Sequence, residues 1–326
     1  IKTIRNEYEM NHIKNSLSDY NSNSITKIGF AVDMEIVPSK IQLVNISGNT
    51  LEGDIFYVKN KINYIESAKI ENTSTTIKDF FQNNSVETKV MNSYYGSDVN
   101  TPINLKNEKT IFSDESTIET AYQYAYEKGN QKLIDANMVG IPLDTEVKKD
   151  GKTISKAETK YDNPVNLLPS SVLSYNMQSN TPSTEVTYDI YDGKRNLIQY
   201  TTKAGVSTSI IWGYNQTQPI AKIEGAKLSD ITQTLINSIV NASDDTNANY
   251  SESTLLNQLD AFRIALPNFQ ISTYTYKPLI GVTTITPPSG IREYYFYDTA
   301  NRLESVKTNE NGVLTTLKEY QYHYKP

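Results

Sequence analysis

Apolar and polar residues alternate with a period of two along much of this chain. Tyrosines two positions apart mark the pattern in three places: Tyr122, Tyr124 and Tyr126; Tyr274 and Tyr276; and Tyr320, Tyr322 and Tyr324. A period of two places each set on one face of a β-strand and the residues between them on the other face. At helical pitch the same tyrosines would scatter around the axis. The pattern therefore predicts a mainly β protein.

Turn signals separate the strand-like runs. Residues 41–46 lead into Ser47-Gly48-Asn49 and residues 51–58 return, which predicts a β-hairpin. Residues 72–118 contain short runs between clusters of Asn, Ser and Asp, typical of strands and loops. Glycine turns lie between later runs at Asp150-Gly151, Ala204-Gly205, Ser289-Gly290 and Asn311-Gly312. Glycine supplies the positive φ that tight hairpin turns require.

One segment departs from the β pattern. Two sets of apolar residues recur every three or four positions: Leu228, Ile231, Leu235 and Ile239; and Leu255, Leu259, Phe262 and Leu266. This spacing gives each of two helices one apolar stripe. Ser229 or Asp230 can cap the first helix and Ser251 the second, and Pro267 ends the segment. We expect a helical hairpin inserted at about residues 226–266, with its apolar stripes buried on the sheet.

One stretch of the chain occurs twice. Each copy has a Tyr-Asp pair, a Leu five residues after the Asp, a Gly turn and two closely spaced aromatic residues. The first copy comprises Tyr191, Asp192, Leu197, Gly205, Trp212 and Tyr214, and the second comprises Tyr297, Asp298, Leu303, Gly312, Tyr320 and Tyr322. Two copies in register predict a structural unit that stacks on its own kind. We expect each Asp to accept N–H bonds in a tight turn and each Tyr to pack across a strand pair.

The composition fits half-buried β-structure. Of 326 residues, 37% are hydrophobic, and 24 Tyr far outnumber 8 Phe and 1 Trp. A tyrosine ring packs on a pleated surface while its hydroxyl reaches water. The net charge of −6 argues against a nucleic-acid partner and against an anionic membrane surface. No apolar run is long enough to span a bilayer, and the chain opens in a polar stretch without a signal peptide, so we expect a fragment of a longer protein.

Residues that carry enzyme chemistry are scarce. The chain has no cysteine, which excludes disulfides, thiol catalysis and thiolate metal sites. Its two histidines, His12 and His323, stand at opposite ends and offer neither a His-rich metal site nor a plausible catalytic base. The carboxylate pairs Asp114-Glu115 and Asp244-Asp245 adjoin no apolar run that would raise a pKa. We therefore predict no catalytic residue, no metal and no cofactor.

The chain from about residue 120 onward resembles a known family. The blocks that carry the resemblance are Val139-Gly140-Ile141-Pro142-Leu143, Tyr191-Asp192 with Asn196-Leu197, Trp212-Gly213-Tyr214-Asn215, Pro219-Ile220-Ala221-Lys222-Ile223, residues 274–283, residues 285–290, Tyr297-Asp298 and Arg302-Leu303. They are similar to YD-repeat (RHS-type) proteins, and more narrowly to large secreted or surface RHS-like proteins of Bacteroidetes bacteria. The resemblance covers roughly residues 120–326.

The resemblance implies a fold. Such repeats form β-hairpins that build a curved or shell-like sheet, so we expect residues 120–326 to form this YD-repeat region. Residues 1–119 match no family that we can name, and we expect a β-rich part continuous with the shell. The family's Gly before Asn/Arg-Leu is replaced by Arg195 in the first copy and Asn301 in the second. Asn adopts a left-handed conformation readily and Arg less so. In the first copy, Gly193 would then adopt the turn conformation in place of Arg195.

Three functions remain open, none of them enzymatic. The first is a structural scaffold, a fragment of a large secreted or cell-surface bacterial YD-repeat protein that builds a β-shell or display wall. Its partner would be the rest of the parent polypeptide or an associated cargo domain. The second is a carbohydrate-binding adhesin module, with Trp212 and Tyr214 as contacts for surface glycans. The third is the encapsulating shell of a polymorphic toxin whose toxic domain lies outside this fragment. None involves nucleic acid or membrane insertion.

Overall fold

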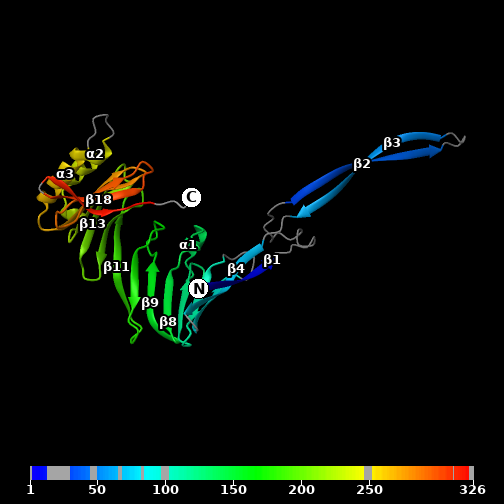
Figure 1. The fold of residues 1–326 in the computed structure, drawn as a ribbon, viewed down its shortest axis with the longest axis horizontal. Helices are drawn as coiled ribbons and strands as arrows, with labels where there is room; N and C mark the ends of the chain where they lie inside the picture. Colours follow the sequence, from blue (N-terminus) through cyan, green and yellow to red (C-terminus); the bar gives the residue numbers. More distant parts are fainter. Residues whose placement is uncertain are drawn as a thin grey trace. The chain divides into compact units, whose positions relative to one another are not determined.

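The fold is mainly β. The computed structural model describes residues 2–12, 30–44, 50–64, 68–81, 84–96, 103–245, 252–310 and 312–322. Within these residues, one sheet contains 17 strands and a second contains 2 (Figure 1). Repeated antiparallel hairpins make up the large sheet, which confirms the predicted fold class. The predicted turn at residues 47–49, the cap Ser251, Asn311, His323 and Tyr324 lie outside the described residues.

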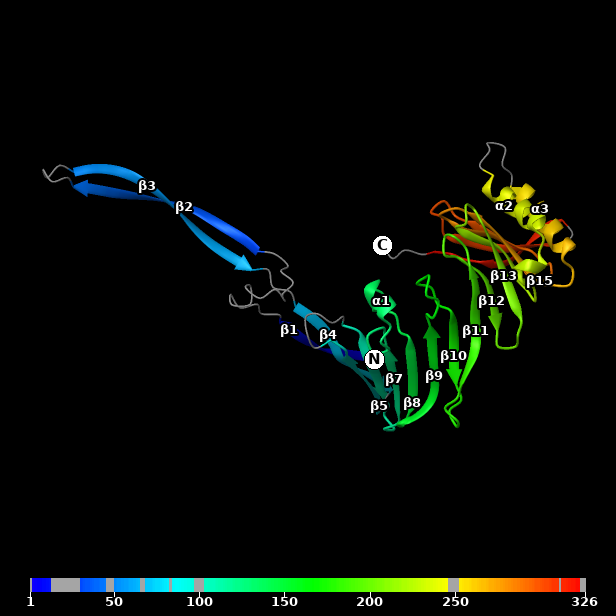
Figure 2. The ribbon, with the colours of Figure 1, turned by 180° about the vertical axis from the view of Figure 1, so that it is seen from behind.

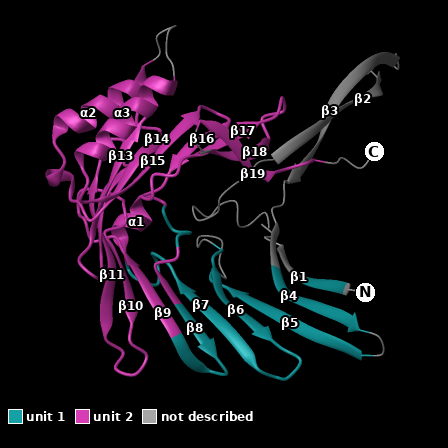
Figure 3. Cartoon of the chain, turned by 60° about the vertical axis from the view of Figure 1, so that its left-hand side comes forward, with its two compact units in different colours: residues 1–129, 138–141, 146–154 teal, residues 130–137, 142–145, 155–326 magenta. Residues whose placement is uncertain are grey.

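The chain divides into two compact units (Figure 3). Unit 1 comprises residues 1–129, 138–141 and 146–154, and unit 2 comprises residues 130–137, 142–145 and 155–326. In unit 1 the first strand pairs antiparallel with β4, and β4 to β7 then pair in chain order. These strands are β1 (Lys2–His12), β4 (Ala68–Phe81), β5 (Asn84–Tyr94), β6 (Leu105–Ile111) and β7 (Thr117–Gln123). The domain boundary after residue 119 stays a prediction.

A long hairpin forms the small sheet. It consists of β2 (Phe30–Val44) and β3 (Thr50–Tyr64). The two strands pair antiparallel without a register shift, from Phe30 opposite Tyr64 to Val44 opposite Thr50. This confirms the hairpin predicted from residues 41–58.

From β9 onward, each strand pairs antiparallel with the next one along the chain, as far as β19. Figure 2 shows the first of these strands, β9 to β13, side by side in this order. Two strands, β8 (Asp144–Lys149) and β9 (Lys152–Lys160), contribute residues to both units. The remaining strands of unit 2 are β10 (Ser171–Tyr175), β11 (Pro182–Tyr191), β12 (Leu197–Thr202), β13 (Ser207–Gly213), β14 (Gln218–Glu224), β15 (Gln270–Lys277), β16 (Gly281–Thr286), β17 (Glu293–Tyr297), β18 (Leu303–Glu310) and β19 (Val313–Glu319).

Helices interrupt this succession between β14 and β15. The segment contains the 3₁₀ helix η2 (Leu228–Asp230), α2 (Gln233–Asp244) and α3 (Glu252–Ala265), which confirms the predicted insertion. The start of the first helix was predicted too early. The Asp230 carboxylate accepts from the Lys227 backbone N–H at 2.9 Å and so caps η2, while α2 begins after Thr232. A further short helix, α1 (Gln131–Asp135), lies elsewhere in unit 2.

The hydrophobic core of unit 2 lies between this helical hairpin and the sheet. Both apolar stripes point inward, with Ile239, Leu255 and Phe262 at 1% exposure or less. They pack in one cluster with Ile220 and Ile223 of β14. In Figure 1 α2 and α3 lie side by side next to the strands around β13. Burial of the stripes on the sheet is therefore confirmed.

Two of the three predicted tyrosine stripes are wrong. β7 ends at Gln123 because the Tyr124 backbone N–H donates to the Glu127 side chain (3.0 Å) instead of to a neighbouring strand, and Tyr126 lies in the following turn. β19 likewise ends at Glu319, before the third stripe begins. The pair on β15, residues 274 and 276, does lie on one strand face.

All four predicted glycine turns are present. Gly151, Gly205, Gly290 and Gly312 each connect consecutive strands with φ between 77° and 85°. Such values are strained for any residue with a Cβ. The turn chemistry could therefore be predicted from local sequence alone.

Candidate binding site at the first Tyr-Asp turn

The first Tyr-Asp pair makes a tight turn between β11 and β12. One carboxylate oxygen of Asp192 accepts the backbone N–H groups of Lys194 (2.9 Å) and Asn196 (2.8 Å). The other oxygen accepts from the Asn196 side-chain amide at 3.0 Å. The backbone of the turn closes on itself, since the Arg195 N–H donates to the Asp192 carbonyl at 3.0 Å. The Asp side chain is thus fully engaged in holding its own turn.

The second pair repeats this geometry between β17 and β18. Asp298 accepts the backbone N–H groups of Ala300 (2.8 Å) and Arg302 (2.9 Å), and the Arg302 guanidinium at 2.8 Å takes the place of the Asn amide. The backbone N–H of Arg302, then its guanidinium, and to a smaller extent the backbone N–H of Ala300 lower the pKa of the Asp298 carboxyl. Tyr191 and Tyr297 stand opposite Leu197 and Leu303, respectively, in the two strand pairs.

The Tyr-Asp tyrosines reach across to other parts of the sheet. The Tyr191 hydroxyl donates to the Pro169 carbonyl at 2.8 Å, and the Tyr297 hydroxyl to the Val282 carbonyl at 2.9 Å. The second contact depends on Gly281, because a Cβ at that position would collide with the Tyr297 ring. Sequence reasoning missed Gly281, since its role lies in a contact between strands.

One closing aromatic residue in each copy donates to the Leu of the Tyr-Asp block. The Trp212 indole N–H donates to the Leu197 carbonyl (3.0 Å), and the Tyr322 hydroxyl donates to the Leu303 carbonyl (2.8 Å). The donor is thus the first closing aromatic in the first copy and the second closing aromatic in the second copy. The other closing aromatic of the second copy, Tyr320, is 40% exposed.

Arg195 carries the strained turn position itself. It has φ of 72°, and the equivalent Asn301 has φ of 60°. Gly193 does not have a positive φ, so the expectation that it would replace the missing family glycine is wrong. The carboxylate of Asp192 holds the backbone N–H groups on both sides of Arg195, which fixes the residue in this conformation.

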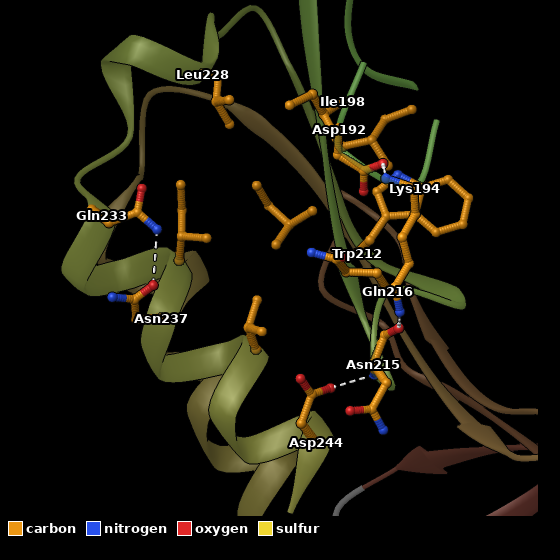
Figure 4. Close-up of a pocket in the computed structure, with 14 residues that line it drawn as sticks. Asp192, Lys194, Ile198, Trp212, Asn215, Gln216, Leu228, Gln233, Asn237 and Asp244 are labelled. Atoms are coloured by element: carbon orange, nitrogen blue, oxygen red, sulfur yellow. Dashed lines mark hydrogen bonds between the residues drawn. The ribbon is translucent and has the colours of Figure 1, made fainter. Parts of the chain in front are cut away.

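A pocket of about 500 Å³ lies beside the first turn, between α2 and the strands β12 and β13 (Figure 4). We call it the α2 pocket. Its apolar lining residues are Ile198, Ile210, Ile211, Trp212, Leu228, Ile236 and Val240, and its polar lining residues are Asp192, Lys194, Asn215, Gln216, Gln233, Asn237 and Asp244. The pocket thus brings Trp212, one of the two predicted glycan contacts, together with Asp192 of the turn.

Tyr214, the other predicted glycan contact, does not line this pocket. Its ring packs against the core cluster and meets the Tyr276 ring edge-on, with centroids 5.7 Å apart. Its hydroxyl accepts the Tyr276 backbone N–H at 2.9 Å. The site therefore contains Trp212 without Tyr214.

The turn that borders the α2 pocket is strained. Three consecutive residues, Tyr214, Asn215 and Gln216, have φ of 51°, 57° and 61°. A left-handed conformation costs roughly 1–2 kcal/mol per residue with a Cβ, and such residues normally occur singly. The end of α2 holds the turn, since Ser243 accepts the Tyr214 N–H (3.2 Å) and Asp244 accepts the Asn215 N–H (2.7 Å).

Two smaller pockets lie beside the tyrosines of the two Tyr-Asp pairs. One of about 260 Å³ is lined by residues 188–191, and one of about 270 Å³ by residues 294–297. Both sets end on the Tyr of a Tyr-Asp pair. Burial raises the pKa of Tyr191 to about 12, with a further contribution from the neighbouring tyrosines at positions 188 and 161.

Metal-site geometry is absent from the described part of the chain, where no three His, Cys, Asp or Glu side chains could hold an ion. In the carboxylate pair Asp114-Glu115, Asp114 accepts hydrogen bonds from the hydroxyl and the backbone N–H of Ser116, and these hydrogen bonds lower the pKa of the Asp114 carboxyl. In the described residues, no helix combines the length and apolar character needed to cross a membrane.

Comparison with known proteins gives only distant likenesses. No family model and no curated protein matches the chain. Among solved structures, the crystal structure of TcdB2-TccC3-Cdc42 is 11% identical with a TM-score of 0.36, over 77% of this chain and 12% of that one. The Photorhabdus luminescens Tc holotoxin pore is also 11% identical, with a TM-score of 0.33, over 79% and 12%.

A porin-like protein from Bacteroides uniformis is 13% identical with a TM-score of 0.19, over 87% of this chain and 92% of that one. This chain spans about an eighth of the two Tc chains. At TM-scores below 0.5, these likenesses establish neither the function nor the partners of this chain.

Proposed function

We propose that this chain is a non-catalytic structural scaffold, a wall segment of a larger secreted or cell-surface YD-repeat (RHS-like) protein. The observation that supports this role is the matching hydrogen bonding around Asp192 and Asp298. In both turns the carboxylate accepts the N–H groups two and four residues further on. A repeated geometry of this kind serves to build a sheet unit by unit.

The polar atoms of each Tyr-Asp pair are committed to this structure. The Asp192 carboxylate accepts three hydrogen bonds from its own turn, and the Tyr191 hydroxyl donates to a backbone carbonyl. A nucleophile or general base needs a lone pair directed at a substrate. The geometry that the two turns share therefore favours a mechanical role over a catalytic one.

The partner of such a wall would be the rest of the parent polypeptide or an associated cargo domain. A more specific version of the proposal is that the wall encloses a toxic domain that lies outside this chain. In either form this chain contributes the wall and another part contributes the activity. Secretion or surface display rests on the resemblance of the repeat blocks to secreted RHS-like proteins.

Cryo-electron microscopy of the longest native form, isolated from its source cells, tests the proposal. We expect residues 120–326 to form part of a continuous wall that encloses or displays density for another domain. A separate domain with no such wall would overturn the proposal, as would substrate turnover that maps to this chain.

Limited proteolysis of the same native form provides an independent test. The double variant Asp192→Ala/Asp298→Ala should expose an enclosed domain to trypsin, because both turns lose their carboxylate acceptors. The double variant Asp192→Asn/Asp298→Asn is the control, since Asn also forms this kind of turn. Equal protection in both double variants would contradict a role for the turns in the wall.

A further inference from the structure

The α2 pocket has the size and lining of a ligand site. Its volume of about 500 Å³ falls in the usual range of small-molecule pockets, roughly 300–1,000 Å³. Ile198 and Ile210 line it from the sheet, and Ile236 and Val240 line it from α2. All four are only partly buried, so an apolar surface remains open between the helix and the strands.

Carboxamide side chains surround this apolar surface. Asn215 and Gln216 come from the strained turn after β13, and Gln233 and Asn237 come from α2 (Figure 4). The Asn237 oxygen accepts from the Gln233 amide at 2.8 Å, so the two carboxamides on α2 are hydrogen-bonded to each other (Figure 4). Together the carboxamides offer neutral donors and acceptors on both sides of the pocket.

Backbone strain is concentrated at the same place. The three consecutive left-handed residues 214–216 carry two of the four carboxamides. Strain of this kind persists where the surrounding structure enforces it, and it clusters at binding sites. Here Ser243 and Asp244 of α2 enforce it. The turn holds Asn215 and Gln216 at the edge of the pocket.

The charges in the pocket disfavour an anionic ligand. Asp192 and Asp244 against Lys194 give a net charge of −1 (one cation minus two anions), which opposes phosphates and carboxylates. The Lys194 ammonium already donates to the Asn215 carbonyl, and Asp192 is engaged by its own turn. Because Lys194, Asp192 and Asp244 all take part in hydrogen bonds within the protein, a neutral ligand with hydrogen-bonding groups and an apolar face fits the pocket best.

We propose that the α2 pocket binds a neutral acetamido sugar, with room for a disaccharide. The sugar's methyl group would pack on the aliphatic walls, and its ring face would lie near Trp212. The carboxamides would bind the hydroxyl groups and the acetamido N–H and C=O. This site is independent of the scaffold role, because none of the Tyr-Asp hydrogen bonds needs to change for a sugar to enter.

The single tryptophan makes the test direct. Trp212 is the chain's one Trp and lines the pocket, so its fluorescence reports binding there without a label. The full chain is titrated with N,N′-diacetylchitobiose to about 10 mM, and with cellobiose, which lacks both acetamido groups. We expect a saturable change in emission with the acetylated disaccharide and a Kd at least about tenfold weaker for cellobiose.

Two asparagines one helical turn apart on α2 provide the matched variants. Asn237 lines the pocket, whereas Asn241 is exposed on the same helix and does not. Asn237→Ala should weaken the acetylated disaccharide about tenfold, as expected when one hydrogen bond is lost, while Asn241→Ala leaves its Kd within about twofold. Val240→Phe should abolish binding by filling the pocket. Thermal melts of each variant establish that it is folded.

Three results would overturn the proposal. They are an unchanged Trp212 emission with the acetylated disaccharide, equal affinity for cellobiose, and equal weakening by the variants at positions 237 and 241. Each leaves the scaffold proposal intact, because the wall is tested by microscopy and proteolysis of the parent protein.

Discussion

At the scale of single residues, hydrogen bonds from tyrosine hydroxyls to backbone carbonyls recur throughout the described sheet. The donors are Tyr94, Tyr95, Tyr124, Tyr191, Tyr276, Tyr297 and Tyr322. Each hydroxyl binds a carbonyl elsewhere in the chain, and every one of these residues except the exposed Tyr322 is partly or fully buried. Phenylalanine cannot make the hydroxyl contact. This contact accounts for a tyrosine rather than a phenylalanine at each of these seven positions.

These hydroxyls make stability sensitive to alkaline pH. Burial raises the pKa of Tyr191 and of Tyr276 from 10.0 to about 12. Above pH 10 the unfolded chain loses these protons while the folded chain keeps them, so the free energy of unfolding falls until about pH 12. Urea titrations between about pH 9 and pH 11 measure the slope, which should be shallower in Tyr191→Phe. An unchanged slope in that variant would contradict the assignment.

The strained position of the first turn gives a second prediction. Arg195 is exposed and has φ of 72°, so Arg195→Gly should raise the free energy of unfolding by about 1 kcal/mol. Arg195→Ala removes the side chain but keeps the Cβ, and should bring no such gain. Urea denaturation compares the three proteins. Equal stability of the Gly and Ala variants would show that the backbone is not strained at this position.

At the scale of elements, the helical hairpin is fastened to the sheet by polar contacts as well as by its core. The Arg263 guanidinium on α3 donates to the Pro287 carbonyl at 2.9 Å and also to the Ile271 carbonyl. Arg292, before β17, binds Asp260 on the same helix. α3 is therefore tied to the Pro287–Gly290 turn, one of the blocks that resembles YD-repeat proteins. The insertion is thus joined by side-chain contacts to the strands that follow it, although it interrupts the β pattern.

Replacement of Arg263 should weaken the attachment of α3 to the sheet. Arg263→Lys keeps the charge but loses the planar guanidinium, whose two nitrogens donate to the Ile271 and Pro287 carbonyls, so we expect a loss of about 1–3 kcal/mol in the free energy of unfolding. Ile264→Ala on the next residue is the control, because Ile264 is 79% exposed and should change stability by less than about 0.5 kcal/mol. Thermal and urea melts provide the measurement. An unchanged free energy of unfolding in Arg263→Lys would indicate that the hydrophobic core alone holds the helix.

At the scale of the whole molecule, buried apolar residues are unevenly distributed. The large core cluster lies entirely in unit 2, where the helical hairpin covers the sheet. Among the described side chains of unit 1, Tyr124 and Ala125 are the buried apolar residues. Polar pairs take their place, such as Ser74 with Glu7 and Asn107 with Glu119. Since apolar burial supplies most of the folding free energy, unit 2 should be the more stable unit.

This asymmetry predicts two unfolding transitions in urea. Far-UV circular dichroism follows both units, whereas Trp212 fluorescence follows unit 2 alone, so the dichroism should begin to change at lower urea. Phe262→Ala should shift the fluorescence transition by about 3–5 kcal/mol and leave the earlier change in place. Superimposable dichroism and fluorescence curves in the unsubstituted chain would show a single cooperative unit instead.

Much of the fold followed from local sequence, because strands, helices and turns each have short-range signatures. The apolar spacing at Leu255 and Leu259 predicted a helix face, and the glycine turns predicted the hairpins. The ends of strands were less predictable. β7 stops at Gln123 because a Glu127 side chain competes for the next backbone N–H, which the tyrosine spacing does not reveal.

The candidate site divides in the same way. The sequence by itself determined the two Tyr-Asp turns, since an Asp and the N–H groups two and four residues later are neighbours along the chain. Only the tertiary structure decided that Trp212 lines a pocket while Tyr214 packs against the core. That outcome depends on α2, which begins 21 positions after Trp212 (233 − 212) and is placed by burial of Ile239 against the sheet. Contacts of this kind arise from packing in three dimensions, and the spacing of residues along the chain does not encode them.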